Sequence, residues 1–136
     1  MTAEQLLLDE THAWLSRARR DLHSATLLSA GGEYGAALFH CQQAAEKAIK
    51  AFLTFHQRPF RKTHELGELI PECQAIDPSL RSVLTGAKEL SKYAWRFRYP
   101  GAPYEPDAAE AADAFAKAEA VVREIEQRLP APPIVP

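Results

Sequence analysis

The sequence predicts an all-α protein, an antiparallel up-and-down bundle of four to five helices. Apolar residues recur at intervals of three and four over long segments, which is the period of an amphipathic helix. No alternation of apolar and polar residues lasts for the four or more positions that a half-buried strand requires. The segments between the periodic stretches are short, and short connections favour neighbouring helices that run in opposite directions.

Two long helices are predicted in the first half of the chain. The first extends from about Thr2 to Ala30, and its apolar face consists of Leu8, Leu15, Ala18, Leu22 and Ala25. The stretch GGEYG ends it, because glycine adopts the left-handed conformation that closes many helices. The second helix extends from about Glu33 to His56. Its stripe covers more positions: Tyr34, Ala37, Leu38, Cys41, Ala45, Ala48, Phe52 and Phe55.

Proline and capping residues mark the next two helices. Pro59 predicts a loop, after which Thr63 is expected to cap a short third helix from about His64 to Gln74. Asp77 followed by Pro78 is a typical helix start and begins the fourth helix, which Pro100 should stop. The expected apolar face of the fourth helix is Leu80, Val83, Ala87, Leu90, Ala94 and Phe97.

A fifth helix follows the loop PGAPYEP, with Asp107 as its cap. Its buried stripe is predicted to be Ala111, Phe115, Ala118, Val122, Ile125 and Leu129. Residues 1–129 are therefore expected to form a single domain. Residues 130–136 are rich in proline and are expected to form a loose or extended tail.

Composition restricts the possible functions. A formal net charge of -2 provides no global positive field for sequence-independent binding of nucleic acid, so any such contact needs a local basic patch. Two cysteines are too few for a secreted disulfide framework and indicate a reducing cytoplasm. The acidic N-terminus is unlike a signal peptide, and no apolar run approaches the roughly 20 residues of a membrane span. We therefore expect a cytoplasmic, unprocessed protein with no membrane partner.

A polar stripe follows the second helix directly beside its apolar face. It contains His40, Gln43, Lys47 and Lys50, at spacings of three, four and three. An imidazole, an amide and two ammonium groups at the rim of a helix interface could bind a phosphate or line a subunit contact. The alternative is a solvated flank in which Glu46 pairs with Lys50 four residues later.

The stretch YAWRFRYPG places two arginines among aromatic residues. In an α-helix Arg96 and Arg98 point to nearly opposite sides, so they cannot hold one anion together. Phe97 belongs to the predicted core. Arg98, near the end of the fourth helix, could reach helix carbonyls or extend over an adjoining groove, or simply complement the helix dipole.

A basic loop precedes the predicted third helix. It contains Arg58, Arg61 and Lys62, and His64 follows at the expected helix start, where free amides favour an anion. Arg58 and His64 have a spacing that could pair a charge stabiliser with an acid or base in RNA cleavage. Alternatively, His64 only caps its helix. No His, Cys and carboxylate residues show ligand spacing, so neither a metal nor a cofactor is expected.

Three segments together resemble the HEPN domain family of small helical prokaryotic proteins. These are RARRDLHSATLLSAGGEYGAALFHCQQAAEKAIKAFL, RKTHELGELIPEC and ELSKYAWRFRYPG, and the likeness extends over about Leu6 to Leu129. The resemblance implies a helical bundle that usually forms a homodimer. It also implies nucleotide or RNA binding, sometimes with metal-independent ribonuclease activity, and partnership with a minimal nucleotidyltransferase in toxin and antitoxin or defence systems.

The resemblance also suggests which residues act. The ribonuclease branch carries an arginine followed four to six residues later by a histidine near the start of a late helix, and this chain has no histidine after Arg98. Enzymatic activity is therefore left open, with His64, Arg58 and Arg98 as the catalytic candidates. The resemblance assigns a nucleotide-binding or partner-binding role to Lys47, His64, Arg98 and Tyr99. With the residues from the spacing arguments, the expected binding set is His40, Gln43, Lys47, Lys50, Arg61, His64, Arg98 and Tyr99.

Three hypotheses follow. The first is a non-catalytic binding module, a homodimer whose polar groove receives a nucleotide phosphate or a nucleotidyltransferase. The second is a metal-independent ribonuclease toxin in which His64 transfers protons and Arg58 or Arg98 stabilises the phosphorane. The third is a purely structural homodimer whose rim charges are only solvated.

Overall fold

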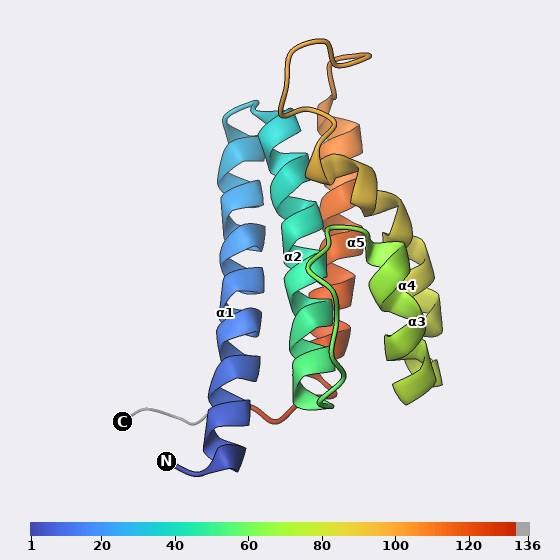
Figure 1. Cartoon of the computed structure of the whole chain (residues 1–136). Helices are drawn as coiled ribbons and strands as arrows, with labels where there is room; N and C mark the ends of the chain where they lie inside the picture. Colours follow the sequence, from blue (N-terminus) through green and yellow to red (C-terminus); the bar gives the residue numbers. More distant parts are fainter. Residues whose placement is uncertain (133–136) are drawn as a thin grey trace.

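The computed structural model describes residues 1–132, and every regular element within them is helical (Figure 1). The α-helices are α1 (Ala3–Ala30), α2 (Tyr34–Phe55), α3 (Leu66–Ile76), α4 (Arg81–Ala87) and α5 (Ala108–Glu126). Two 3₁₀ segments flank α4, namely η1 (Pro78–Leu80) and η2 (Lys88–Ala94). The predicted all-α bundle is confirmed.

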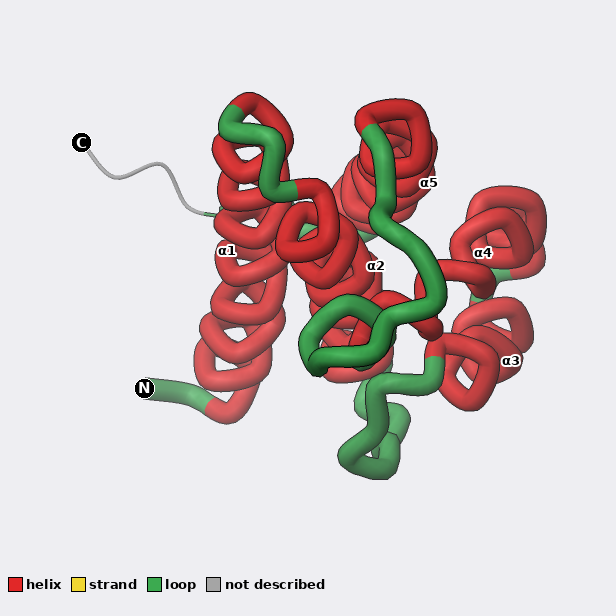
Figure 2. The backbone as a smooth tube through the Cα atoms, turned by 90° about the horizontal axis from the view of Figure 1, so that it is seen from above, coloured by secondary structure: helices red, strands yellow, loops and turns green. Residues whose placement is uncertain are grey.

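The three long helices α1, α2 and α5 form the main body, with α3 and α4 beside them (Figure 2). Thr2 and Gln5 form a capping box that starts α1. Near the end of α5, Glu126 pairs with Arg19, and the Pro130 carbonyl accepts a hydrogen bond from His12 at 2.9 Å. These contacts join the C-terminal end of α5 to the N-terminal half of α1, so the two helices are antiparallel and α5 runs in the same direction as α2.

Helix α2 lies at the centre of the fold. Fourteen of its 22 residues are buried, because α1, α5, α3 and η2 all pack against it. A helix surrounded in this way is buried on nearly all sides, unlike the one-sided amphipathic helix that its sequence predicts. The polar residues Gln42, Gln43, Glu46 and Lys50 are buried together with the apolar stripe.

The loop of residues 56–65 returns along α2 before α3 begins (Figure 1). At its start the Arg58 amide donates to the Leu53 carbonyl, and at its end the His64 carbonyl accepts from the Gln42 side chain at 3.0 Å. Helix α3 then runs parallel to α2, in the opposite direction to the loop, because Glu72 on α3 reaches Arg58 just after the C-terminal end of α2. The loop thereby places His64 against the middle of α2.

Helix α3 begins at Leu66, two residues later than predicted. Thr63 does not cap the helix; its hydroxyl accepts the Glu65 amide in a local turn, at 3.1 Å. The Leu66 amide instead donates to the Ser91 hydroxyl of η2 at 2.9 Å, a partner distant in sequence. His64 therefore lies in the loop, before the helix begins. Pro71 lies inside α3.

The predicted fourth helix changes its winding. Asp77 caps the Ser79 amide as expected, but the α-helix ends at Ala87 and a 3₁₀ helix continues only to Ala94, six residues before Pro100. The buried residues Leu84, Ala87, Leu90 and Tyr93 recur every three residues. A 3₁₀ helix has three residues per turn, so this spacing keeps Ala87, Leu90 and Tyr93 on one face.

The fifth helix agrees with its prediction. Asp107 accepts the Glu110 amide at 2.9 Å as the cap, and Ala111, Ala118, Val122 and Ile125 are buried. No helix in residues 1–132 is both long and apolar enough to cross a membrane. Of the predicted proline-rich tail, Pro130 to Pro132 carry no regular structure and residues 133–136 lie outside the described part of the chain.

Candidate functional site

Asp21 of α1 is a buried carboxylate that holds two basic side chains of α2. One of its oxygens accepts a hydrogen bond from His40 Nδ1 at 2.7 Å, and the other accepts one from Lys47 Nζ at 2.6 Å. His40 and Lys47 are seven residues apart, two helical turns, and therefore lie on the same face of α2. Because Nδ1 of His40 faces the carboxylate, the ring presents Nε2 on its opposite side.

Glu46 of α2 is a second buried carboxylate, and its donors come from two parts of the chain. Gln42 and His64 Nδ1 donate to one oxygen at 3.0 and 2.8 Å, and Lys50 donates to the other at 2.9 Å. Burial alone would raise the pKa of Glu46. The hydrogen bonds from Gln42, Lys50 and His64 outweigh burial, so its pKa is lowered and the carboxylate stays charged.

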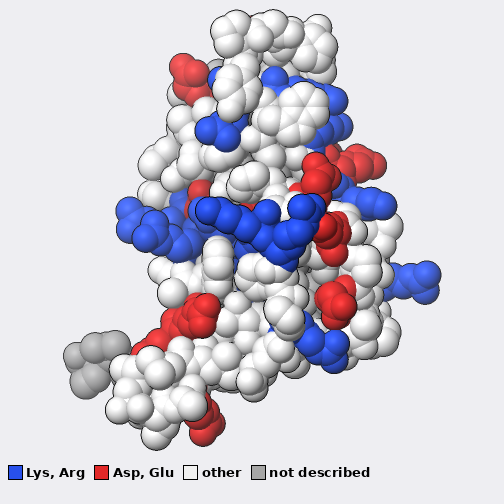
Figure 3. All heavy atoms as spheres, in the orientation of Figure 1, with Lys and Arg blue, Asp and Glu red and all other residues white. Residues whose placement is uncertain are grey.

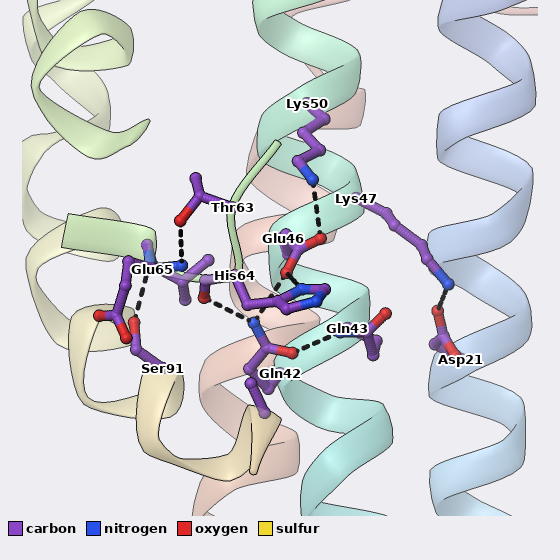
Figure 4. Close-up of polar contacts among 12 residues, drawn as sticks. Asp21, Gln42, Gln43, Glu46, Lys47, Lys50, Thr63, His64, Glu65 and Ser91 are labelled. Carbon is purple, nitrogen blue, oxygen red and sulfur yellow. Dashed lines mark hydrogen bonds and ion pairs between the residues drawn. The ribbon is translucent and has the colours of Figure 1, made fainter. Parts of the chain in front are cut away.

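His64 is fixed at both its backbone and its ring (Figure 4). Its carbonyl accepts from Gln42 and its Nδ1 contacts Glu46, yet 63% of its side chain is exposed. Glu46 therefore fixes the Nδ1 edge of the imidazole, while most of the side chain remains exposed to solvent. His64 and Gln43 differ in this respect, because the Gln43 amide is buried and donates to Gln42 Oε1 at 2.6 Å.

Lys50 points into the protein. Its ammonium pairs with Glu46 and lies 5.7 Å from the Trp14 ring centre and 5.6 Å from that of Phe60. The predicted pair of Glu46 and Lys50 is thus present, but it is buried rather than solvated. Lys50 supports the carboxylate and does not present its charge to a ligand.

Arg98 reaches α2 from the turn after η2. Its guanidinium lies 4.8 Å from the centre of the Phe39 ring, and it also approaches the Ala94 carbonyl at 3.5 Å. Phe39 in turn contacts the ring of His40 edge-on, with 5.3 Å between centres. Arg98 and His40 are therefore neighbours through one aromatic ring. The approach of Arg98 to a helix carbonyl, one of the alternatives from the sequence, is observed, and the contact with Phe39 adds its packing against α2.

Two predicted residues are engaged elsewhere. Arg58 pairs with Glu72 at 3.2 Å, and Arg61 forms two contacts with Glu68, at 2.8 and 3.2 Å. All four side chains are exposed. The structure does not bring Arg58 to His64, since Arg58 remains at the end of α2 while the loop carries His64 back to Glu46.

We call the set Asp21, His40, Glu46, Lys47 and His64 the α2 polar site. The sequence prediction included His40, Lys47 and His64, missed Asp21, and named Glu46 only as the partner of Lys50 in a solvated flank. Asp21 had a detectable signal, because it interrupts the buried stripe of α1 at a core position between Ala18 and Ala25. Gln42, Glu46 and Lys50 are spaced by four on a buried helix, which indicates a polar ladder facing another element.

Basic side chains form a band across the face that carries this site. Figure 3 shows Lys and Arg atoms gathered across the middle of the molecule, on the side seen in Figure 1. Lys47 and His40 contribute partly exposed donors, and the exposed His64 imidazole adds another. Partly exposed basic side chains backed by buried carboxylates form a preorganised set of donors for an anion, or a pair of groups able to transfer protons.

Comparisons with known proteins agree on one family. The HEPN domain model matches residues 11–128 of the chain. The crystal structure of ST0689, an archaeal HEPN homologue, matches with a TM-score of 0.73 and 28% sequence identity, covering 88% of this chain and 97% of that chain. The crystal structure of TT1696 from Thermus thermophilus matches with a TM-score of 0.78 and 28% identity, covering 88% of this chain and 98% of that one. No curated protein sequence matches the chain significantly.

Proposed function

Since the chain belongs to the HEPN domain family, we propose that it is a binding module whose α2 polar site holds the phosphate groups of a nucleotide or an RNA. The observation that supports this proposal is the pair of buried carboxylates, each holding an imidazole through Nδ1. This arrangement orients both rings and leaves Nε2 for a ligand. Lys47, held by the same carboxylate as His40, adds a charged donor.

The charge balance of the site favours an anion. Asp21 and Glu46 are matched by Lys47 and Lys50, so the two acids need no charge from the imidazoles. The imidazoles of His40 and His64 are therefore additional hydrogen-bonding groups on a face whose buried acids are already balanced by ammonium groups. Arg98, which has no carboxylate partner among the described residues, adds a further cation on the same side of α2.

We propose further that the module acts with a minimal nucleotidyltransferase, in a pair of the toxin and antitoxin or defence type, and that it works as a homodimer. Family membership supports this part of the proposal. A nucleotidyltransferase binds a substrate that is rich in phosphate. The α2 polar site, as a set of donors for an anion, suits contact with such a substrate in the complex of the two proteins.

Isothermal titration calorimetry tests the proposal directly. The protein is titrated with a nucleoside triphosphate, with a 5′-phosphorylated oligoribonucleotide and with a purified nucleotidyltransferase encoded beside it. We expect binding to at least one of them, weakened about tenfold or more in Lys47→Gln. Lys117→Gln is the matched control, because Lys117 pairs with Asp113 and Glu89 on a different surface. Absence of all binding would leave the structural homodimer as the remaining hypothesis.

A metal-independent ribonuclease is a second candidate, and His64 is the observation that favours it. A buried carboxylate orients its ring, and the ring remains exposed, as a general acid or base requires. The test is incubation of the protein with RNA in the presence of a chelator. Cleavage that survives His64→Ala at the parental rate would refute this assignment, as would the absence of cleavage by the parent.

A further inference from the structure

Residues 95–104, which we call the aromatic loop, carry an unusual set of exposed rings. Trp95, Tyr99 and Tyr104 are 55%, 65% and 42% exposed. The other large apolar side chains exposed to this degree in residues 1–132 are aliphatic: Met1, Leu6 and Leu27. All strongly exposed Trp, Tyr and Phe rings of the described chain are thus concentrated in ten residues.

The loop is supported from beneath. Tyr93 and Tyr104 both donate their hydroxyls to one oxygen of Glu110, at 2.6 and 2.7 Å. Phe97 stacks on Tyr93 and contacts Tyr104 edge-on, with ring centres 6.1 and 5.3 Å apart. Phe97 also packs closely on Gly35 of α2, because a Cβ added to Gly35 would lie 3.0 Å from the Cβ of Phe97. The contacts of Tyr93, Phe97 and Tyr104 therefore hold the aromatic loop against α2 and α5.

Each outermost ring has a guanidinium beside it. Arg96 lies 5.7 Å from the centre of the Trp95 ring, and Arg98 lies 5.9 Å from that of Tyr99. Neither arginine pairs with a carboxylate within residues 1–132. Of the acids nearby, Asp107 caps α5 and Glu110 is occupied by the two tyrosines, whereas Glu105 is exposed.

The aromatic loop is continuous with the α2 polar site. Arg98 packs on Phe39, and Phe39 contacts His40, so cations and rings alternate from Tyr99 to the site. Single-stranded nucleic acids are commonly bound by positive grooves that follow the phosphates, combined with aromatic rings on which the bases stack. We infer that the aromatic loop is a stacking platform for the bases of single-stranded RNA whose phosphates bind the α2 polar site.

This inference rests on the proposed function and specifies its ligand. A second copy of the chain is the competing occupant for exposed aromatic rings. A two-fold contact centred on the loop would bring Arg96 and Arg98 close to the same arginines of the partner, and like charges facing each other are unfavourable. RNA supplies the opposite charge and a flat face for each ring, so the charges of the loop favour RNA.

The experiment compares two probes of equal length, an oligouridine and an abasic oligonucleotide with the same phosphate backbone. Removal of one stacked ring in Trp95→Ala or Tyr99→Ala should weaken oligouridine binding by about 5-fold to 100-fold and leave abasic binding unchanged. Trp95→Phe should recover most of the affinity. Leu6→Ala, which removes an exposed apolar side chain at the other end of the bundle, should change neither affinity.

Tryptophan fluorescence provides an independent readout. The chain has two tryptophans, so Trp14→Phe leaves Trp95 as the only emitter. Oligouridine should quench that emission, and the abasic probe should leave it unchanged. Circular dichroism of each variant is the control that tests whether the fold is retained.

The outcomes separate the two proposals. If both probes bind the parent with equal affinity and neither ring matters, the stacking platform is refuted and phosphate binding stands. If neither probe binds, the stacking platform is refuted together with RNA binding at the α2 polar site. If the ring variants reduce self-association in sedimentation but retain full RNA affinity, the surface belongs to a second copy and the inference is overturned.

Discussion

Asp21 and Glu46 bring formal charge into the core of the bundle, and each is compensated by more than one donor. Removing an ion from water costs several kcal/mol, which a single ion pair often fails to recover. Here Asp21 has two basic partners, and Glu46 has an ammonium, an amide and an imidazole. No buried side-chain nitrogen or oxygen among the described residues lacks a hydrogen-bond partner. The donors therefore make the buried charges tolerable, and they also fix the positions of His40 and His64.

Replacement of Glu46 tests this compensation. Glu46→Gln leaves the buried Lys50 ammonium without its counter-charge, so we expect a loss of about 3 to 5 kcal/mol in the free energy of unfolding. Urea unfolding followed by circular dichroism measures this loss. Glu72→Gln serves as a control, because the pair of Glu72 with Arg58 is exposed and should contribute little. An unchanged midpoint in Glu46→Gln would contradict the account.

The same carboxylate predicts a pH dependence. The folded state lowers the pKa of Glu46, so its contribution to stability is complete above the unfolded pKa and is lost as the pH falls through the folded pKa. Parental stability should therefore decrease on acidification below about pH 4, the usual range of a Glu carboxyl. Glu46→Gln should flatten that part of the profile, measured as unfolding free energy from pH 7 to pH 3. An equally steep acid limb in the variant would show that other groups carry it.

At the residue scale, the sequence allowed about half of the site to be predicted. His40 and Lys47 were found because spacing along one helix places them on one face. His64 was found from its position after the basic loop, and the resemblance to the family pattern also indicated it. The contacts were missed because each one joins segments that are distant in sequence. Asp21 on α1 contacts His40 on α2, and His64 in the returning loop contacts Glu46 on α2. Spacing within a helix carries no information about which element faces it.

Helix boundaries illustrate the same limit at the scale of elements. Local capping signals located the start of η1 at Asp77 and of α5 at Asp107, because a cap depends on the adjacent amides. The start of α3 was misplaced because the Leu66 amide has a partner 25 residues away. The 3₁₀ segment was missed because spacings of three and four also fit one α-helical period, although the buried apolar positions from Leu84 to Tyr93 recur every three residues.

Two glycines give a prediction about the elements. Gly86 lies in α4, and a Cβ there would meet no atom within 4 Å, so Gly86→Ala should stabilise the protein by about 0.5 to 1 kcal/mol through helix propensity. Gly35→Ala, on α2, would press on Phe97 and should destabilise by about 1 kcal/mol. Thermal unfolding of both variants checks the contrast. A stabilised Gly35→Ala would mean that the aromatic loop is free to move away from α2.

For the molecule as a whole, the all-α class and the bundle were predictable because long periodic segments dominate the chain. The path of the chain was less predictable. Residues 56–65 return along α2, so α3 runs in the same direction as α2 rather than opposite to it. That return places His64 on the α2 polar site, and it depends on contacts made by Gln42 and Glu46, which are distant in sequence.

The domain boundary is a further prediction at this scale. Leu129 is buried against the core, whereas the proline-rich segment of residues 130–136 was predicted to be a tail outside the domain. A chain that ends at Pro132 should keep the parental unfolding midpoint. A chain that ends at Arg128 should lose about 2 kcal/mol with the Leu129 side chain. Equal destabilisation of both truncated chains would place the boundary beyond residue 132.

The central claim is that the α2 polar site binds phosphate, and salt dependence tests it most directly. The affinity for a 5′-phosphorylated oligoribonucleotide is measured at several salt concentrations for the parent, Lys47→Gln and Lys117→Gln. If Lys47 binds a phosphate, Lys47→Gln should make the slope of log affinity against log salt about 0.7 less steep, whereas Lys117→Gln keeps the parental slope. Identical slopes and affinities in all three proteins would contradict the claim.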